Sequence, residues 1–263
     1  MTVTPLQKAP WYRPVARELD VFRAAHAQRL PVLLKGPTGC GKTRFVEAMA
    51  AELERPLVTV ACNDETSAID LLGRYVVFGG DTVWQDGPAT RAARQGAVLY
   101  LDEIAEARED VLVVLHPLSD HRREIHLDRR DETVLAADGF MLVVSFNPGY
   151  QRGLKELKPS TRQRFVTLAF QYPEAAIETE IVATETGVEP ELARRLVAFA
   201  RKVRGLAELG LQETVSTRLL VAAATLIRAG LPPRLACNAA IVQPLSDDAE
   251  VLAALEDAVA LAF

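Results

Sequence analysis

The chain has 263 residues, of which 49% are hydrophobic and 25% are charged, and its formal net charge is -5. These values are ordinary for a globular protein long enough to form one large domain or two modest ones. A protein that binds nucleic acid mainly through phosphates usually carries a basic excess, so the acidic balance disfavours a DNA or RNA motor. A protein with an acidic net charge can still carry a small basic patch, so binding of nucleic acid remains an open alternative.

The sequence contains no apolar run of signal-peptide length and no uncharged segment of membrane-span length. Its three cysteines, Cys40, Cys62 and Cys237, show no paired spacing. An odd, small number of cysteines argues against a disulfide framework and against a zinc cluster. We therefore expect a cytoplasmic, reduced protein without a membrane span and without bound nucleic acid.

Short apolar, β-rich runs alternate with amphipathic stretches in the first two thirds of the chain. Most of the runs lack polar alternation, which is typical of strands buried on both faces of a parallel sheet. This alternation predicts an α/β core. The expected strands lie at residues 32–34, 57–60, 97–101, 141–145 and 165–168.

The pattern becomes helical after Tyr172 and Pro173. Apolar residues of segment 192–203 fall on one helical face, and Ser216 is placed to cap a helix that ends near Gly230. We expect an α/β domain over residues 1–171 and a small all-helical domain over residues 172–263.

A glycine-rich segment follows the first expected strand and precedes an expected helix. It fits the phosphate-binding P-loop pattern and consists of Gly36, Pro37, Thr38, Gly39, Cys40, Gly41, Lys42 and Thr43. Its backbone N–H groups and the helix N-terminus would hold phosphates, and Lys42 would reach the terminal ones. Thr43 would ligate Mg²⁺, so the expected cofactors are ATP and Mg²⁺.

Acidic and amide side chains end two further strands. Asp102 and Glu103 follow the strand at 97–101, where Asp102 would hold Mg²⁺ and Glu103 would polarise the attacking water. The alternative is an acidic helix N-terminus. Asn147 ends the strand at 141–145 and would contact the γ-phosphate, although Asn-Pro-Gly is also an ordinary turn sequence.

These motifs together resemble the AAA+ superfamily of ATPases over nearly the whole chain. The resemblance implies a five-stranded parallel sheet of order 5-1-4-3-2 with a helical lid, and it makes Asn147 the sensor 1 residue. In the segment Leu157–Phe165, Arg164 fits best as the arginine finger, with Arg162 close behind, and Arg218 matches the sensor 2 arginine. A finger from a neighbouring subunit requires a ring, expected to be a homohexamer. Without the resemblance, a solvated basic surface is the alternative for both finger candidates.

The segment Trp84–Ala89 looks like the Gly-Pro element of the MoxR branch, and two flanking segments look like its hairpin insertions, at 73–83 and 122–139. Closer still, residues 30–50 and 145–165 resemble the CbbQ, NorQ and NirQ group, and CbbQ most. This resemblance implies a partner with a von Willebrand factor A domain and a protein client, with Rubisco favoured. The alternative is NorQ-like maturation of, or metal insertion into, nitric oxide reductase or another metalloenzyme.

Four other features carry weaker expectations. The second hairpin is a hypothetical lever to the client, in which Ile125 and Leu127 are expected to tolerate serine without loss of basal ATPase activity. The spacing of His116, His121 and His126 does not predict a metal site. Tyr12 is compatible with an adenine contact or with a structural plug. A small-molecule kinase would also use a P-loop, but it would not need a neighbour's arginine.

Overall fold

A computed structural model describes residues 9–148, 157–205 and 214–263. By their contacts, residues 9–36, 42–148 and 157–169 form an α/β unit. Residues 37–41 group instead with 170–205 and 214–263 in a second, helical unit. The resemblance segment 145–165 is only partly described, because its residues 149–156 lie outside these ranges.

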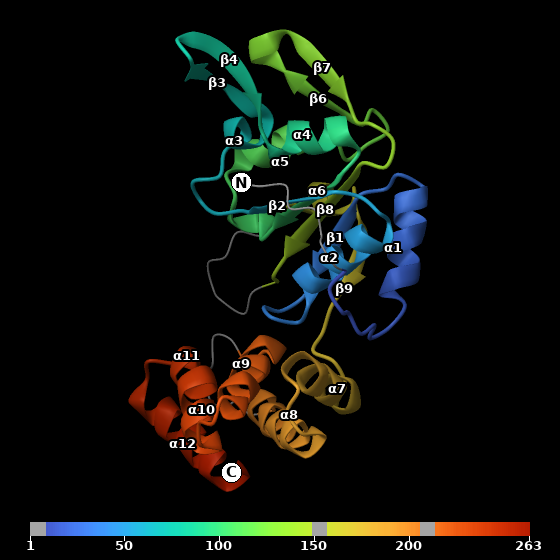
Figure 1. Ribbon diagram of the computed structural model, residues 1–263. Helices are drawn as coiled ribbons and strands as arrows, with labels where there is room; N and C mark the ends of the chain where they lie inside the picture. The colour runs from blue at the N-terminus through green and yellow to red at the C-terminus, as the bar shows by residue number, and fades with distance from the viewer. Residues whose placement is uncertain (1–8, 149–156, 206–213) are drawn as a thin grey trace. The chain divides into compact units, whose positions relative to one another are not determined.

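Five parallel strands form the central sheet of the α/β unit (Figure 1), and they match the five expected runs. Their spatial order is β2-β5-β8-β1-β9, which is 5-1-4-3-2 when the sheet strands are numbered along the chain, as predicted. The strands are β1 (Val32–Lys35), β2 (Leu57–Ala61), β5 (Val98–Asp102), β8 (Met141–Phe146) and β9 (Val166–Ala169).

Six helices of the α/β unit lie in the described ranges, and several of them pack apolar side chains against the core of the sheet. They are α1 (Glu18–Ala27), α2 (Lys42–Glu52), α3 (Ala68–Leu72), α4 (Pro88–Gln95), α5 (Glu109–Leu115) and α6 (Pro159–Arg162), with 3-10 turns at Ile104–Glu106 and Asp128–Arg130. Helix α4 shows how the sequence sets helix ends: Pro88 occupies its first turn and Gly96, with a φ of 63°, ends it. Strand β8 is buried along its whole length, as expected for a covered parallel sheet.

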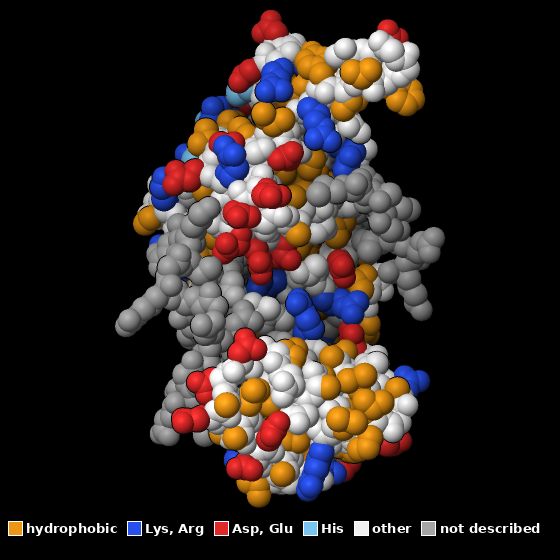
Figure 2. Space-filling model, turned by 90° about the vertical axis from the view of Figure 1, so that its left-hand side faces the viewer, with side chains coloured by type: hydrophobic (Ala, Val, Ile, Leu, Met, Phe, Trp, Pro, Cys, Tyr) orange, Lys and Arg blue, Asp and Glu red, His pale blue; other side chains and the backbone are white. Residues whose placement is uncertain are grey.

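Both expected insertions are antiparallel hairpins. They are β3 (Gly73–Phe78) with β4 (Asp81–Asp86), and β6 (Glu124–Leu127) with β7 (Glu132–Leu135). The hairpins touch, because the Tyr75 hydroxyl donates to the Arg129 carbonyl oxygen at 3.2 Å. Figure 2 shows hydrophobic side chains exposed at the end of the unit where Figure 1 places the hairpins. The exposed apolar residues of β3 and β4 are Tyr75, Val77, Phe78 and Val83.

The expectation for Ile125 and Leu127 is wrong. Their side chains are only 1% and 2% exposed and belong to the core cluster of the α/β unit. Serine at these positions would leave cavities and bury hydroxyl groups, so it would destabilise the unit rather than test a client contact. The exposed apolar residue of this hairpin is Leu135, at 68%.

The helical unit has its own apolar core. Its helices are α7 (Ala175–Thr186), α8 (Pro190–Arg204), α9 (Thr217–Arg228), α10 (Pro233–Cys237), α11 (Gln243–Leu245) and α12 (Ala249–Ala262), with a π-helical turn at Asn238–Val242. Ser216 caps α9 as predicted, since its hydroxyl accepts the Leu219 N–H at 3.4 Å. Across the described ranges, no helix is long and apolar enough to cross a membrane.

Candidate functional site

The carboxyl ends of β1, β5 and β8 meet at one edge of the sheet. Lys35 at the end of β1 pairs with Phe146 on β8, and Leu101 on β5 pairs with Val144. Three of the sequence motifs begin directly after these ends, because parallel strands bring all their carboxyl termini to the same side. Open α/β sheets bind ligands at this side.

The glycine-rich loop joins β1 to α2 in this region. Gly39 and Gly41 have φ angles of 69° and 99°, a backbone conformation that residues with a Cβ rarely adopt. Lys42 begins α2 and is largely buried, and its ammonium group donates to the Gly36 carbonyl oxygen at 2.8 Å. The loop therefore places N–H groups, a helix N-terminus and a buried cation together, which fits an anion such as a phosphate.

Thr43 lies across from the end of β5. Its hydroxyl donates to the Asp102 carboxylate, with 3.4 Å between the two oxygens. A hydroxyl beside a single carboxylate suits Mg²⁺, which uses few protein ligands and completes its shell with phosphate and water oxygens. The two predicted Mg²⁺ ligands are thus brought together, and they fit that ion.

Two further side chains, which sequence reasoning missed, hold Asp102. The Tyr100 hydroxyl donates to Asp102 Oδ1 at 2.7 Å, and the Ser145 hydroxyl donates to the same oxygen. Both residues are fully buried. Burial, together with the bond to Asp102, raises the pKa of Tyr100 above its usual range, so its hydroxyl stays a donor. The signal was present: Tyr100 lies two residues before Asp102, and Ser145 two before Asn147, so each shares a strand face with a predicted site residue.

Glu103 follows with a left-handed backbone, at φ 55° and ψ 49°. This conformation is unusual for a residue with a side chain and tends to occur at functional sites. The Glu103 N–H donates to the Ser145 hydroxyl at 2.8 Å, which fixes the turn. The Glu103 side chain is exposed at the carboxyl edge of the sheet. Asn147 follows β8 at the same edge and is half-buried.

Arg162 and Arg164 are not brought to this edge. They precede β9, and β9 runs parallel to β1 with Val166 beside Val32 and Ala169 beside Lys35. At about 3.3 Å per residue, these paired strands separate the two edges by about 10 Å before the loops are counted. Arg162 and Arg164 therefore lie at the amino edge, away from the Lys42 of the same chain.

Arg218 lies beside Gly39 within the helical unit, to which residues 37–41 belong. A Cβ added to Gly39 would lie 2.6 Å from Ser216 Cβ and 3.3 Å from Arg218 Cβ. Arg218, the predicted sensor 2 arginine, is exposed at the start of α9.

A buried ion pair fixes the start of α9. Glu178, which is 0% exposed, accepts two hydrogen bonds from Arg204, each at 2.8 Å, and one from the Thr217 hydroxyl at 2.6 Å. The Arg204 guanidinium also lies 4.1 Å from the centre of the Tyr172 ring, whose hydroxyl donates to the Thr38 carbonyl oxygen at 3.0 Å. These contacts orient Arg218 through its own helix.

The other candidates take ordinary structural places. The Tyr12 ring packs on Phe45, and its hydroxyl donates to Glu18 at 2.9 Å, which fits the structural plug. Among the residues that the structure describes, no group of three or more His, Cys, Asp or Glu side chains could hold a metal ion. All three cysteines lie in the described ranges, are buried and form no disulfide, and burial raises the pKa of Cys62 to about 12.

The comparisons with known proteins first define the class. Residues 31–165 match the family described as AAA domain (dynein-related subfamily). The fold is also that of RuvB from Thermotoga maritima, of which one solved mutant matches with a TM-score of 0.57 at 18% identity, over 92% of this chain and 68% of that one. A putative ATPase from Cytophaga hutchinsonii matches with a TM-score of 0.53 at 15% identity, over 95% and 90% of the two chains. The chain has an AAA ATPase domain.

The family follows from the rest of the chain. Residues 178–262 match the CbbQ/NirQ/NorQ C-terminal family. The chain is 59% identical to Protein NorQ of Paracoccus denitrificans over 97% of its length and 94% of the relative's. It is 55% identical to the Denitrification regulatory protein NirQ of Pseudomonas aeruginosa over 96% and 97%, and 50% identical to Protein CbbQ of Hydrogenophilus thermoluteolus over 98% and 97%. The protein belongs to the CbbQ/NirQ/NorQ family, and these identities do not favour CbbQ over NorQ.

Replacement of Ser145 by alanine tests the network around Asp102. The variant removes the acceptor of the Glu103 N–H and one donor to Asp102, and it leaves buried polar groups unpaired. We expect the free energy of unfolding to fall by about 1–3 kcal/mol. Denaturant unfolding would measure it, with Thr59→Ala, an exposed hydroxyl residue of β2, as the control. Equal stability of the two variants would contradict the network.

Proposed function

We propose that this protein is a Mg²⁺-dependent ATPase that works as a homo-oligomeric ring, a hexamer, and remodels a protein client. The observation that carries this proposal is the position of Arg164. It lies at the amino edge of the sheet, whereas Lys42, Thr43 and Asp102 lie at the carboxyl edge. Within one chain the nucleotide site lacks this arginine, and a neighbouring copy of the chain can supply it.

Each residue of the carboxyl edge has a role in this proposal. The N–H groups of the loop from Gly36 to Thr43 hold the phosphates, and Lys42 neutralises the terminal ones. Thr43 and Asp102 would hold Mg²⁺, which would stabilise negative charge on the terminal phosphates. The Glu103 carboxylate accepts a hydrogen bond from the attacking water and orients it. The Asn147 side chain donates to the γ-phosphate or to that water.

Arg164 contributes through charge. Negative charge spreads over the oxygens of the transferring phosphoryl group, and a guanidinium placed there accelerates the reaction by about 10³–10⁵. Arg162, at the end of α6, is the alternative donor on the same edge. Arg218 acts on the chain's own nucleotide, and its place beside Gly39 supports this role.

We place the domain boundary at 171/172, which the limits of the two family matches, 165 and 178, support.

For the client, we propose an enzyme of denitrification, matured together with a partner that carries a von Willebrand factor A domain. The higher identity to NorQ and NirQ supports this choice, and the resemblance to NorQ points to nitric oxide reductase. Rubisco is the second candidate, because the chain is also 50% identical to CbbQ over nearly its whole length. The three cysteines, none of which forms a disulfide, support a cytoplasmic location.

Two inactive variants should restore activity to each other. Arg164→Ala should bind ATP but not hydrolyse it. Every site in such a ring keeps its own phosphate-binding loop but loses the guanidinium that its neighbour supplies. Glu103→Gln should behave in the same way, since the water loses its acceptor. A mixture forms interfaces with an intact Glu103 and an intact Arg164, so we expect about a quarter of wild-type phosphate release in randomly mixed rings. Nucleotide affinity and phosphate release would be measured together.

Lys42→Ala is the matched control, because it should lose nucleotide binding itself. A mixture of proven mixed rings that never exceeds either inactive variant would exclude a shared site with Arg164. The same mixture with Arg162→Ala would then show whether Arg162 is the donor.

The client can be identified by reconstitution. The protein and its von Willebrand factor A partner would be added, with ATP, to immature nitric oxide reductase and separately to inhibitor-bound Rubisco. We expect ATP-dependent recovery of nitric oxide reduction only, with Glu103→Gln as the control. Recovery of carboxylation instead would assign the protein to the Rubisco branch.

A further inference from the structure

We propose that Asp120 is a positioning residue for Arg164, and thereby acts on the active site of the neighbouring subunit. This inference rests on the proposed function, in which Arg164 completes a neighbour's nucleotide site. No sequence motif includes Asp120, which lies 44 residues from Arg164 in the segment between α5 and β6.

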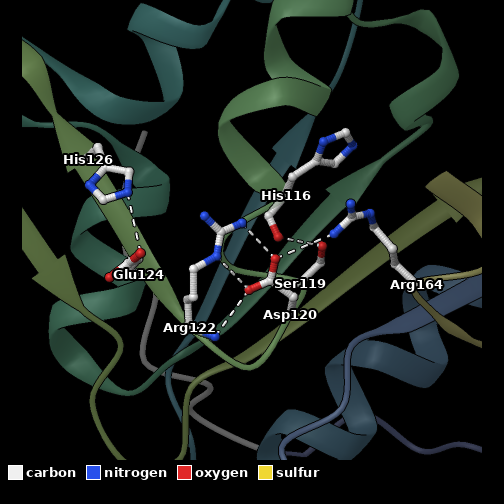
Figure 3. A network of polar contacts seen from close by, with 7 residues as sticks. All are labelled: His116, Ser119, Asp120, Arg122, Glu124, His126 and Arg164. Atoms are coloured by element: carbon white, nitrogen blue, oxygen red, sulfur yellow. Dashed lines mark hydrogen bonds and ion pairs between the residues drawn. The ribbon is translucent and has the colours of Figure 1, made fainter. Parts of the chain in front are cut away.

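The two side chains face each other at the amino edge. Arg164 Nη1 lies 3.5 Å from Asp120 Oδ2, and the side chains are 37% and 22% exposed. Figure 3 shows the Asp120 carboxylate between the guanidinium groups of Arg122 and Arg164. The Arg164 contact is the longer one, so Asp120 limits where this guanidinium points without burying it.

Asp120 is itself held from the other side. Arg122 donates to both carboxylate oxygens, through Nε at 3.0 Å and Nη2 at 2.7 Å, and its backbone N–H donates to Oδ1 at 3.1 Å. Such bidentate pairs fix a carboxylate in orientation as well as in place. The hydrogen bonds from Arg122 also hold the pKa of Asp120 well below its usual range, so the carboxylate stays charged at any working pH.

His116 does not compete for this carboxylate. Its side chain lies near Arg164 in Figure 3, and burial and the Arg164 charge lower its pKa. The imidazole of His116 is therefore neutral at physiological pH, and Arg122 and Arg164 remain the cations that contact Asp120.

Apolar packing keeps the two segments together. Phe165, next to Arg164, packs against the core cluster that includes Leu115 at the end of α5 and Leu118. The Asp120 segment continues into β6 through Arg122, so the foot of the β6–β7 hairpin also helps to fix Asp120. A client that binds this hairpin can thus influence the position of Arg164 through the side chains of Arg122 and Asp120.

The test is the rate of Asp120→Asn rings. An amide of the same shape loses the charge that orients Arg164, and misplacement of a catalytic group by a fraction of an ångström lowers kcat. We expect a fall in kcat of about three- to tenfold with unchanged ATP affinity. Asp120→Glu should recover most of the rate. Asp138→Asn, which breaks the exposed pair with Arg29, is the control and should leave the rate unchanged.

Mixed rings then show on which site Asp120 acts. In rings of Asp120→Asn and Glu103→Gln, the Asp120→Asn sites receive intact arginines, so activity should exceed the mean of the separate variants about threefold. In rings of Asp120→Asn and Arg164→Ala no interface is repaired, so activity should equal that mean. The opposite pattern would place the effect of Asp120 in its own subunit and overturn the proposal.

The outcomes separate this inference from the proposed function. If Arg164→Ala and Glu103→Gln fail to complement each other, the shared site itself is wrong. If they complement each other while Asp120→Asn turns over like wild type, or shows no gain with Glu103→Gln, only the role of Asp120 is wrong.

Discussion

Parallel pairing of β1 with β8 and β9, together with that of β8 with β5, is the constraint on which the rest of the structure depends. It collects the carboxyl ends of β1, β5 and β8 at one edge, where Asp102 ends β5, the glycine-rich loop follows β1 and Asn147 follows β8. It equally sends the residues before β9, Arg162 and Arg164, to the other edge. Reversing a strand would break its backbone hydrogen bonds to the neighbouring strands. No side-chain movement within one chain therefore brings Arg162 and Arg164 to the residues at the carboxyl edge.

At the carboxyl edge, the sheet interior sets the geometry of the acidic residues. Asp102 lies at the end of a buried strand, where its carboxylate accepts from Tyr100, Ser145 and Thr43. In a low-dielectric surrounding each of these bonds is stronger than in water, and each would be costly to leave unpaired. The network also determines the left-handed turn at Glu103, because Ser145 accepts the Glu103 N–H. Asp102, the proposed metal ligand, and the backbone of Glu103, the residue proposed to orient water, are thus positioned by one set of hydrogen bonds.

The sequence predicted the features that local chemistry demands. The glycine-rich loop, the strand before it and the acidic pair of β5 each have a short pattern with one physical purpose, and the structure brings Thr43 and Asp102 together as expected. Contacts that depend on the register of paired strands were missed. The sequence shows Ser145 only as an ordinary strand residue, because the contact with Asp102 requires β8 to lie beside β5. Ile125 and Leu127 were misjudged because alternation shows that a hairpin has an apolar face, but not that this face packs into the core. The comparisons do not support the preference for CbbQ over NorQ, because the motifs behind it are shared across the family.

The most direct measurement is the ATPase rate per chain as a function of protein concentration, with assembly state followed by sedimentation in the same buffer. A site completed by a neighbour's arginine requires assembly, so the rate per chain should fall toward zero as rings dissociate and return on concentration. A rate per chain that stays constant in dilute, dissociated protein would show that one chain holds a complete active site, and it would contradict the account.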